Sequence, residues 1–428
     1  MQDLPLEMIS RIFIHCLPPE TYVRPSQNAA PLLLTQICRS WRRVAISTPQ
    51  LWRSLDIHVF REEERPILDM FHAWVARSGQ LPLSLSFSQT LEAGQPLRDA
   101  LNAAFVDLMH RWRDITFTAG GRASLNSERV LGEAPLLREF VIKLPSDDPV
   151  YLPFSSAPNL QRFTWIGPGN YTIFQGLPLA NLTKVTFFPS ISMDEAISLV
   201  RACIVLEECV LGEMDTRNCA PLRTPLTHPA LRLLYITTEG LVDPFLDSLV
   251  LPALESFSVR HHRPPPTVRW SSRSLEDLYD RSKFALRSLD LVSTNVGEMD
   301  LVRCLMAQHD SLNSLSIDTY PFVASVGEHL LRQLTHPDAL CPRLESIMFS
   351  YCVDHSVALE IMMGMVRSRV SAYLEGCADA AHLQEVRISV PAELYDEYMS
   401  ASVSLCEESL PQGAPLTMHL TAESDSLI

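Results

Sequence analysis

The chain has 428 residues, of which 46% are hydrophobic and 20% are charged, proportions usual for a folded protein and not for a disordered one. Its formal net charge is −15, so nucleic-acid binding is not expected, because phosphate contacts require clustered Lys and Arg. No apolar run approaches the length of a membrane-spanning helix, and the acidic N-terminus does not resemble a secretory signal.

Cysteine usage points to a reducing compartment. The ten cysteines are scattered, without a Cys-x-x-Cys pair, so their spacing supports neither a disulfide framework nor a zinc site. We therefore expect no metal or other cofactor, and a location in the cytoplasm, the nucleus or both.

The segment 4–17, LPLEMISRIFIHCL, predicts an amphipathic helix near the N-terminus. Its apolar residues recur at helical spacing and so share one face: Leu6, Ile9, Ile12, Phe13 and Leu17. Pro5 suits the first helical turn, where a missing N–H is no loss, and Glu7 is favoured at the positive end of the helix dipole.

A second helical pattern follows a proline-rich loop. The loop spans residues 18–31, and residues 32–55 read LLLTQICRSWRRVAISTPQLWRSL. The apolar positions of this pattern again have helical spacing: Leu33, Ile37, Cys38, Trp41, Val44 and Ala45. Pro49 ends the pattern, and Leu51 and Trp52 add two further apolar side chains.

Two short helices cannot bury all of these side chains against each other, so they either pack on the rest of the chain or offer an apolar face to a partner. Residues 3–55 resemble the F-box, the helical motif that docks to the Skp-type adaptor of SCF ubiquitin ligases. The features that carry the resemblance are Leu4-Pro5-x-Glu7, Ile12-Phe13, Leu17, Ile37-Cys38-x-x-Trp41 and Leu51-Trp52. The longer inter-helix loop and the phrase STPQLW are similar to those of F-box proteins abundant in fungi.

The resemblance implies that this module binds the adaptor and, through it, a cullin-RING ligase. The side chains expected to make this contact are Leu4, Pro5, Ile9, Ile12, Phe13, Leu17, Leu33, Ile37, Cys38, Trp41, Val44, Leu51 and Trp52. The alternative is a purely structural role in which Trp41 and Trp52 fill a local core, since amphipathic helices usually pack inward. In the family the two roles coexist.

Beyond the F-box-like segment, the phrase Leu-x-x-apolar-x-apolar recurs. Nine clear copies begin at Leu137, Leu160, Leu182, Leu206, Leu231, Leu254, Leu286, Leu312 and Leu344. A tenth is expected at Leu383, and looser versions begin at Trp52, Pro82 and Trp112. This phrase, with a period in the twenties, is the leucine-rich-repeat signature.

Alternation of apolar and polar residues predicts a short strand in each copy. The first, fourth and sixth positions are apolar in all nine clear copies, whereas the third, fifth and seventh are apolar in only 8 of 27 cases. Successive side chains of a strand point to opposite faces, so one face is expected in the core and the other in solvent.

Segments of helical character lie between these strands, for example at residues 193–203, 298–309 and 326–334. The repeated strand and helix predict an α/β fold with parallel strands on the concave face and helices on the convex face of a solenoid. With the F-box resemblance, the expected architecture is a short helical F-box followed by an irregular leucine-rich-repeat solenoid. The ninth position of the repeat is never Asn, so we expect no continuous Asn ladder and an irregular curvature.

The expected organisation is an F-box at residues 3–55, a leucine-rich-repeat-like solenoid at residues 56–420 and a polar tail at residues 421–428. Residues 262–283 lengthen one repeat, and residues 353–381 are expected to hold a helical insertion before the last strand. Insertions of this kind project from a repeat array.

An apolar strip on solvent-facing strand positions is the expected target site. Its members occupy consecutive repeats: Ile166, Phe188, Val210, Leu233 and Tyr235. Arg162, Lys184 and Glu208 flank the strip. Contiguous exposed apolar area indicates binding better than isolated residues do. The alternatives are that another segment covers the strip, or that the register slips by one residue and turns the whole set inward.

Motifs that could carry catalysis are weak. Cys352, Asp354 and His355 have no base or oxyanion site in the neighbouring sequence, and a turn explains Cys352 better. The adjacent His261 and His262 would point apart on an extended chain, which disfavours a metal site. We therefore expect no catalytic residues and no enzyme activity.

The sequence thus predicts a non-catalytic substrate-recognition subunit of an SCF-type ubiquitin ligase, whose repeats bind an unidentified protein target. The alternative is a non-catalytic leucine-rich-repeat scaffold whose F-box serves a role outside ubiquitin transfer. Neither interpretation involves nucleic acid, a membrane or a cofactor.

Overall fold

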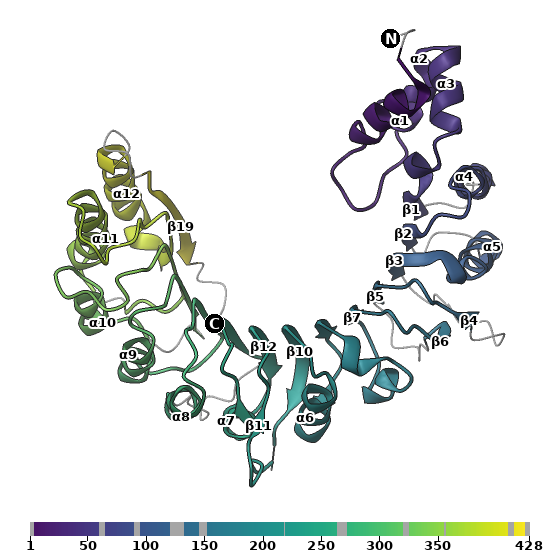
Figure 1. Ribbon diagram of the computed structural model, residues 1–428. Helices are drawn as coiled ribbons and strands as arrows, with labels where there is room; N and C mark the ends of the chain where they lie inside the picture. Colours follow the sequence, from purple (N-terminus) through teal and green to yellow (C-terminus); the bar gives the residue numbers. More distant parts are fainter. Residues whose placement is uncertain are drawn as a thin grey trace. The chain divides into compact units, whose positions relative to one another are not determined.

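The chain folds into two compact units in which parallel strands alternate with helices (Figure 1). The N-terminal unit comprises residues 1–189 and 202–205, and the C-terminal unit comprises residues 190–201 and 206–428. The computed structural model describes residues 4–59, 65–89, 95–119, 132–144, 152–217, 219–262, 272–319, 325–354, 357–409 and 415–423.

Three short helices begin the N-terminal unit: α1 (Leu6–His15), α2 (Leu32–Ile37) and α3 (Arg39–Ile46). The turn η1 (Pro49–Trp52) leads into a parallel sheet with the order β1 (Ser54–Val59), β2 (Leu83–Gln89), β3 (Trp112–Ala119), β5 (Glu139–Lys143), β7 (Arg162–Ile166) and β8 (Lys184–Phe187). The connecting elements are α4 (Arg65–Arg77), α5 (Gln95–Val106), η2 (Met109–Arg111), β4 (Gly132–Glu133), β6 (Phe154–Ser156), η3 (Tyr171–Phe174) and η4 (Leu179–Asn181).

The C-terminal unit repeats the same plan. Its parallel sheet has the order β10 (Glu208–Asp215), β12 (Leu233–Thr238), β14 (Ser256–His261), β15 (Ser288–Val292), β16 (Ser314–Asp318), β17 (Ser346–Ser350), β18 (Glu385–Pro391) and β19 (Thr417–Glu423). Its helices are α6 (Met193–Ala202), α7 (Asp243–Asp247), α8 (Arg273–Ser282), α9 (Glu298–Ala307), α10 (Glu328–Gln333), α11 (Leu359–Leu374) and α12 (Tyr395–Ser409). The short elements are β9 (Ile191–Ser192), β11 (Leu226–Thr227), β13 (Leu249–Val250) and η5 (Ala392–Leu394).

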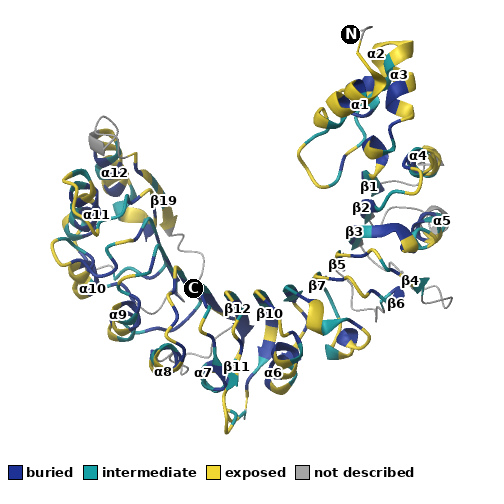
Figure 2. Cartoon of the chain, in the orientation of Figure 1, coloured by how far each residue is buried: buried dark blue, intermediate teal, exposed yellow. Residues whose placement is uncertain are grey.

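The predicted strand register is confirmed in both units. The side chains at the first, fourth and sixth positions of all nine clear repeats are 0% exposed. Phe140 and Phe163, for example, lie opposite each other on β5 and β7 within the core. Helices lie on one side of the strands in each unit (Figure 1), and Figure 2 shows the buried residues that follow the strands. The third, fifth and seventh positions therefore form the other side, which we call the open strand face.

The segment predicted as one second helix forms two helices instead. Cys38 adopts an extended conformation, with φ of −158°, between α2 and α3. Its Sγ accepts a hydrogen bond from the backbone N–H of Trp41 at 3.5 Å and so caps the start of α3. The helical part ends at Ile46, and Ser54 already belongs to β1.

The predicted inter-strand helices are confirmed as α6, α9 and α10, and α8 and α11 occupy the two lengthened repeats. The predicted C-terminal boundary is wrong. The sheet continues past β18 to β19, in which Glu423 pairs opposite Pro391. The sequence of β19 departs from the repeat phrase, because the fourth position, counted with Leu416 as the first, is the polar His419. Residues 424–428 of the expected tail lie outside the described residues.

Hydrogen bonds from other polar side chains link neighbouring repeats in place of an Asn ladder. The Thr238 hydroxyl donates a hydrogen bond to the carbonyl of Met214, one repeat earlier, at 3.0 Å. On the helical side, the Glu298 carboxylate of α9 accepts a hydrogen bond from the backbone N–H of Leu330 in α10 at 2.8 Å. Neighbouring repeats of the C-terminal unit are thus joined at the turns and at the helix starts.

A buried arginine holds the turn that follows α10. Arg369 of α11 is 2% exposed, and its guanidinium donates hydrogen bonds to the carbonyl oxygens of Leu334, Leu340 and Cys341 at 2.8, 2.6 and 3.0 Å. Burial lowers the pKa of this guanidinium to about 10. A charged side chain thus satisfies backbone acceptors in the core of the C-terminal unit.

Candidate protein-interaction surfaces

The three N-terminal helices pack together through a small aromatic core. Ile9 and Phe13 of α1 are buried, as is Val44 of α3. The ring centroids of Phe13 and Trp41 are 4.9 Å apart. These contacts fix the helices to one another.

Trp52 joins these helices to the first repeat. Its ring is 0% exposed, and its Nε1–H donates a hydrogen bond to the carbonyl of Ala45 at 2.8 Å. The ring also makes an edge contact with Trp74 of α4, at a centroid distance of 4.8 Å, and the guanidinium of Arg77 lies 4.5 Å from its centroid. Trp52 is therefore a structural residue.

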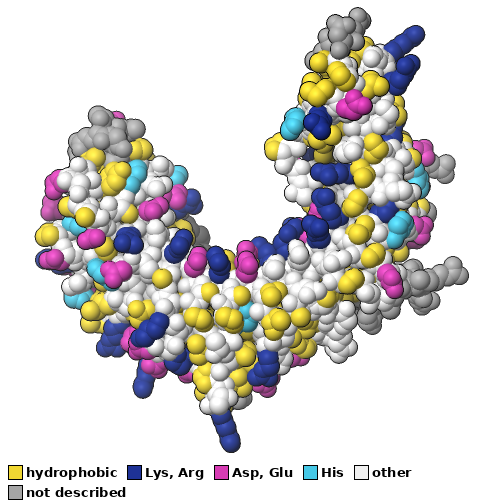
Figure 3. All heavy atoms as spheres, viewed as in Figure 1, with side chains coloured by type: hydrophobic (Ala, Val, Ile, Leu, Met, Phe, Trp, Pro, Cys, Tyr) yellow, Lys and Arg dark blue, Asp and Glu magenta, His cyan; other side chains and the backbone are white. Residues whose placement is uncertain are grey.

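Several other apolar side chains of α1–α3, and Leu4 just before α1, are exposed, whereas Leu34 of α2 is buried. Figure 3 shows hydrophobic side chains gathered on the visible face of these helices. Those more than a third exposed, which we call the exposed helix residues, are Leu4, Leu6, Met8, Ile12, Leu33, Ile37 and Ile46. Leu6 is 65% exposed and Ile37 52%. Exposed apolar side chains grouped in this way are typical of a protein-interaction surface.

The structure separates the expected adaptor contacts into two groups. The exposed or half-buried ones are Leu4, Pro5, Ile12, Leu17, Leu33, Ile37, Cys38 and Trp41. The buried ones are Ile9, Phe13, Val44, Leu51 and Trp52. The buried group packs within the chain and exposes less than a tenth of its surface. Leu6, Met8 and Ile46 are exposed as well, although the expected set omits them.

The inter-helix loop is bound to the edge of the sheet. The backbone N–H of Asp56 in β1 donates a hydrogen bond to the carbonyl of Val23 at 2.9 Å. The Ser54 hydroxyl accepts from the backbone N–H of Val23 at 3.1 Å and donates to the carbonyl of Thr21 at 2.6 Å. The loop thus covers the edge strand with main-chain hydrogen bonds, and it extends the sheet in the same manner as an added strand.

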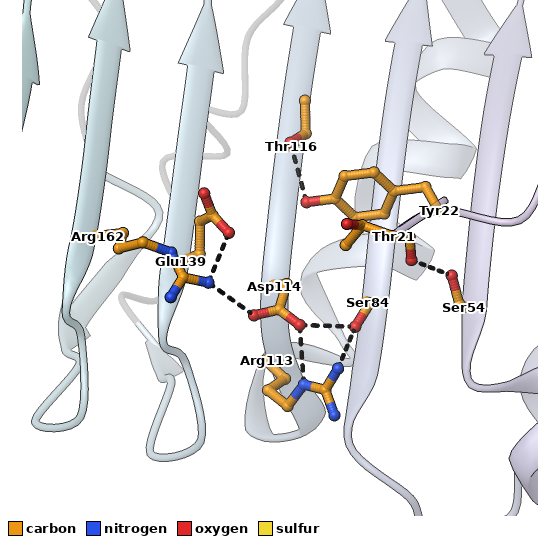
Figure 4. Close-up of polar contacts among 9 residues, drawn as sticks. All are labelled: Thr21, Tyr22, Ser54, Ser84, Arg113, Asp114, Thr116, Glu139 and Arg162. Atoms are coloured by element: carbon orange, nitrogen blue, oxygen red, sulfur yellow. Dashed lines mark hydrogen bonds and ion pairs between the residues drawn. The ribbon is translucent and has the colours of Figure 1, made fainter. Parts of the chain in front are cut away.

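Tyr22 of this loop lies across the open strand face of β2 (Figure 4). Its hydroxyl is 3.0 Å from the hydroxyl of Thr116 on β3. Ser84 and Ser86 of β2 point to the same face and are buried. Burial also raises the pKa of Tyr22 to about 12. The small serine side chains of β2 therefore leave room for an aromatic ring, and the loop supplies it.

A network of ion pairs surrounds this contact (Figure 4). Asp114 of β3 accepts hydrogen bonds from the Ser84 hydroxyl at 2.9 Å and from Arg113 Nε at 2.8 Å. Glu139 of β5 accepts from Arg162 Nη2 at 2.8 Å, and this hydrogen bond raises the pKa of the Arg162 guanidinium. Asp114 and Glu139 are thus each matched by an arginine.

Replacing Tyr22 by Phe should lower the free energy of unfolding by about 1 kcal/mol at neutral pH, because the hydrogen bond to Thr116 is lost. The native tyrosine has a raised pKa in the fold, so its contribution is complete below pH 10 and is lost as the pH rises towards about 12. Urea denaturation across this range measures the effect. An equal alkaline loss of stability in both proteins would contradict the prediction.

The residues of the expected target strip are divided between the two units. In the N-terminal unit, Ile166 is half-buried and Phe188 is exposed, and neither belongs to the core. Arg162 and Lys184 lie opposite each other on β7 and β8. This half of the expected strip therefore lies on the open strand face.

The other half lies on β10 and β12 of the C-terminal unit. Val210 is opposite Tyr235, and Glu208 is opposite Leu233. All four are half-buried, while the alternating positions of both strands, such as Cys209, are fully buried. The alternative of a register slip is therefore excluded for this half, and its side chains point away from the core.

The structure also locates the residues of the weak catalytic motifs. Cys352 is buried, and its thiol donates a hydrogen bond to a backbone carbonyl at 3.4 Å, while His355 lies outside the described residues. His261 is buried, with its pKa lowered by that burial, whereas the neighbouring His262 is exposed. Within the described ranges, no group of three or more His, Cys, Asp or Glu side chains is placed to hold a metal ion.

No described helix combines the length and the apolar character required to cross a bilayer. No protein-family model matches the chain, and no curated protein matches it at a significant level.

Proposed function

We propose that the chain is a non-catalytic substrate-recognition subunit of an SCF-type ubiquitin ligase. Its helices α1–α3 would be the F-box that docks the Skp-type adaptor, and its strands would form a leucine-rich-repeat-like solenoid that binds the target. The observation that carries the proposal is the set of exposed helix residues, seven apolar side chains within the first 46 residues. The proposal places the protein in the cytoplasm, the nucleus or both.

Support for the adaptor site comes from the two-sided character of α1. Its buried residues Ile9 and Phe13 hold the helix in place, so the helix does not need its other side chains for folding. Leu6 and Ile12 remain exposed, although burying each of them would contribute about 1.5–3 kcal/mol. A protein partner that covers these residues explains why they are apolar.

Support for the target site comes from the open strand face. Parallel strands place the side chains of successive repeats side by side, so a long partner can contact several repeats at once. Phe188 in the N-terminal unit and Tyr235 in the C-terminal unit offer large side chains on that face. Aromatic side chains of this kind are enriched at protein interfaces.

Co-purification of the full chain with a Skp-type adaptor and a cullin-RING complex tests the first half of the proposal. We expect the adaptor in stoichiometric amount. Proteins captured by the same complex should then receive ubiquitin in a reconstituted reaction with the cullin-RING complex. Absence of the adaptor would overturn the proposal. Adaptor binding without ubiquitin transfer to any captured protein would favour the scaffold instead.

A further inference from the structure

The α2 helix is weakly anchored, although it carries two of the exposed helix residues. It has six residues, fewer than a helix needs to be stable without tertiary contacts. Leu34 is its one buried side chain. Leu33 and Ile37 lie one helical turn apart on the same face and are 40% and 52% exposed. The direction in which this face points therefore depends on how the ends of α2 are held.

The C-terminal end of α2 is held by a side chain of the next helix. The last four carbonyl groups of a helix have no donor within it, and Cys38 turns the chain into an extended conformation directly after α2. No described backbone N–H donates to the carbonyl of Thr35, which lies in this last turn. Arg42 of α3 supplies the donor, because its Nε–H donates a hydrogen bond to that carbonyl oxygen at 2.7 Å. The guanidinium thus bridges the break between α2 and α3.

The α3 helix is a fixed support for this contact. Val44 and Ala45 of α3 are buried, and the carbonyl of Ala45 accepts the hydrogen bond from Trp52 Nε1 at 2.8 Å. Arg42 is itself exposed, and no carboxylate of the described residues forms an ion pair with it. Its side chain is therefore not required for the core, and its described polar contact is the one with α2.

We infer that Arg42 is a positioning residue for the proposed adaptor site, where its hydrogen bond to Thr35 holds α2 in the orientation that presents Leu33 and Ile37 to the adaptor. The inference rests on the proposed function, since it assigns a role within the proposed docking face. Without this hydrogen bond, α2 would populate other orientations. The apparent affinity for the adaptor would then fall in proportion to the fraction of chains that keep the docking orientation.

The variant Arg42→Gln tests this role. We expect adaptor binding to weaken about tenfold, while the urea midpoint of the chain stays unchanged because the side chain is exposed. The matched control is Arg43→Gln, at the next residue of α3, which is exposed and whose side chain has no polar partner among the described residues. Its adaptor affinity should stay within about twofold of the native value. Equal losses in the two variants would show a general effect of charge and would overturn the inference.

A thermodynamic cycle separates positioning from direct contact with the adaptor. The double variant Leu33→Ala and Ile37→Ala removes the two side chains that α2 presents, so adding Arg42→Gln should weaken adaptor binding no further. In a Leu6→Ala background, which alters α1 instead, Arg42→Gln should still weaken binding about tenfold. A tenfold loss in both backgrounds would mean that Arg42 contacts the adaptor itself, and the inference would be wrong.

Hydrogen exchange of the free chain provides a measurement without the adaptor. In Arg42→Gln, the backbone amides of α2 should exchange about tenfold faster than in the native chain, while those of α3 keep their rates. Unchanged exchange in α2 would overturn the inference whether or not the adaptor binds. If α2 exchanges faster as expected but the native chain binds no adaptor, the proposed function is wrong and the holding of α2 by Arg42 is supported.

Discussion

A variant in which Leu6 and Ile37 are both replaced by Asp is expected to lose the Skp-type adaptor in co-purification. Both side chains are more than half exposed, so the helices do not depend on them for packing. At the interface with a partner, each would contribute about 1.5–3 kcal/mol, and a buried carboxylate would add a further penalty. The affinity should therefore fall by at least about 100-fold, which titration calorimetry or a pull-down series can measure.

The α9 helix offers a matched control. Met299 and Met306 are 56% and 64% exposed, close to the values for Ile37 and Leu6, but they belong to the C-terminal unit. Replacing both by Asp should leave adaptor binding unchanged and alter the free energy of unfolding by less than about 0.5 kcal/mol per site. If the α1 and α2 variant binds the adaptor as well as this control does, the proposed docking face is wrong.

Replacing Arg369 by Met should destabilise the chain by about 3 kcal/mol. The carbonyl oxygens of Leu334 and Leu340 have no other hydrogen-bond donor among the described residues, so both would be left unsatisfied in the core. Each such acceptor costs about 1–3 kcal/mol, and relief from burying the charge offsets part of the total. Urea denaturation, followed by a probe of the C-terminal unit, gives the difference in the free energy of unfolding.

Two further variants separate this effect from a simple loss of charge. Arg369→Lys keeps the positive charge, but one ammonium group cannot donate in the three directions that the guanidinium covers, so only part of the stability should return. Arg332→Met removes an exposed arginine whose one ion-pair partner among the described residues is Glu328 on its own helix, and its effect should stay within about 0.5 kcal/mol. Similar losses for Met at both positions would contradict the account.

The strand register was predictable from the sequence because it rests on a local rule. Alternation in each repeat puts residues such as Leu289 and Leu291 on one face and Asp290 on the other, and no other arrangement buries the leucines. The same rule placed Tyr235 and Phe188 on the open strand face. The positions of helices with polar outer faces, such as α10, were likewise predictable from the helical spacing of their apolar residues.

Which of the expected adaptor contacts are exposed was predictable only in part, because one helical period describes both a core face and an exposed apolar face. Phe13 and Ile12 are neighbours in the sequence, yet Phe13 packs on Trp41 while Ile12 is exposed. Only tertiary contacts decide between these outcomes. Cys38 is a similar case, since its extended backbone depends on a cap that helical spacing does not reveal.

Contacts between distant parts of the sequence were also beyond prediction. Tyr22 and Thr116 are separated by 94 positions, and nothing in either segment indicates that they meet. Arg369 likewise reaches back 35 positions to Leu334. Such pairs depend on which turn faces which side chain after the repeats have stacked, and the repeat phrase does not carry that information.

The attachment of residues 21–23 to β1 and β3 has a practical consequence for protein engineering. Residue 55, where the F-box-like sequence ends, is not a point at which the polypeptide can be cut or recombined without damage, because Trp52 and Tyr22 both reach across it. A chimaera that transplants α1–α3 onto a foreign repeat array should carry β1 through β3 with them. Exchanging the downstream repeats while keeping these helices intact therefore calls for a junction well downstream of the helices.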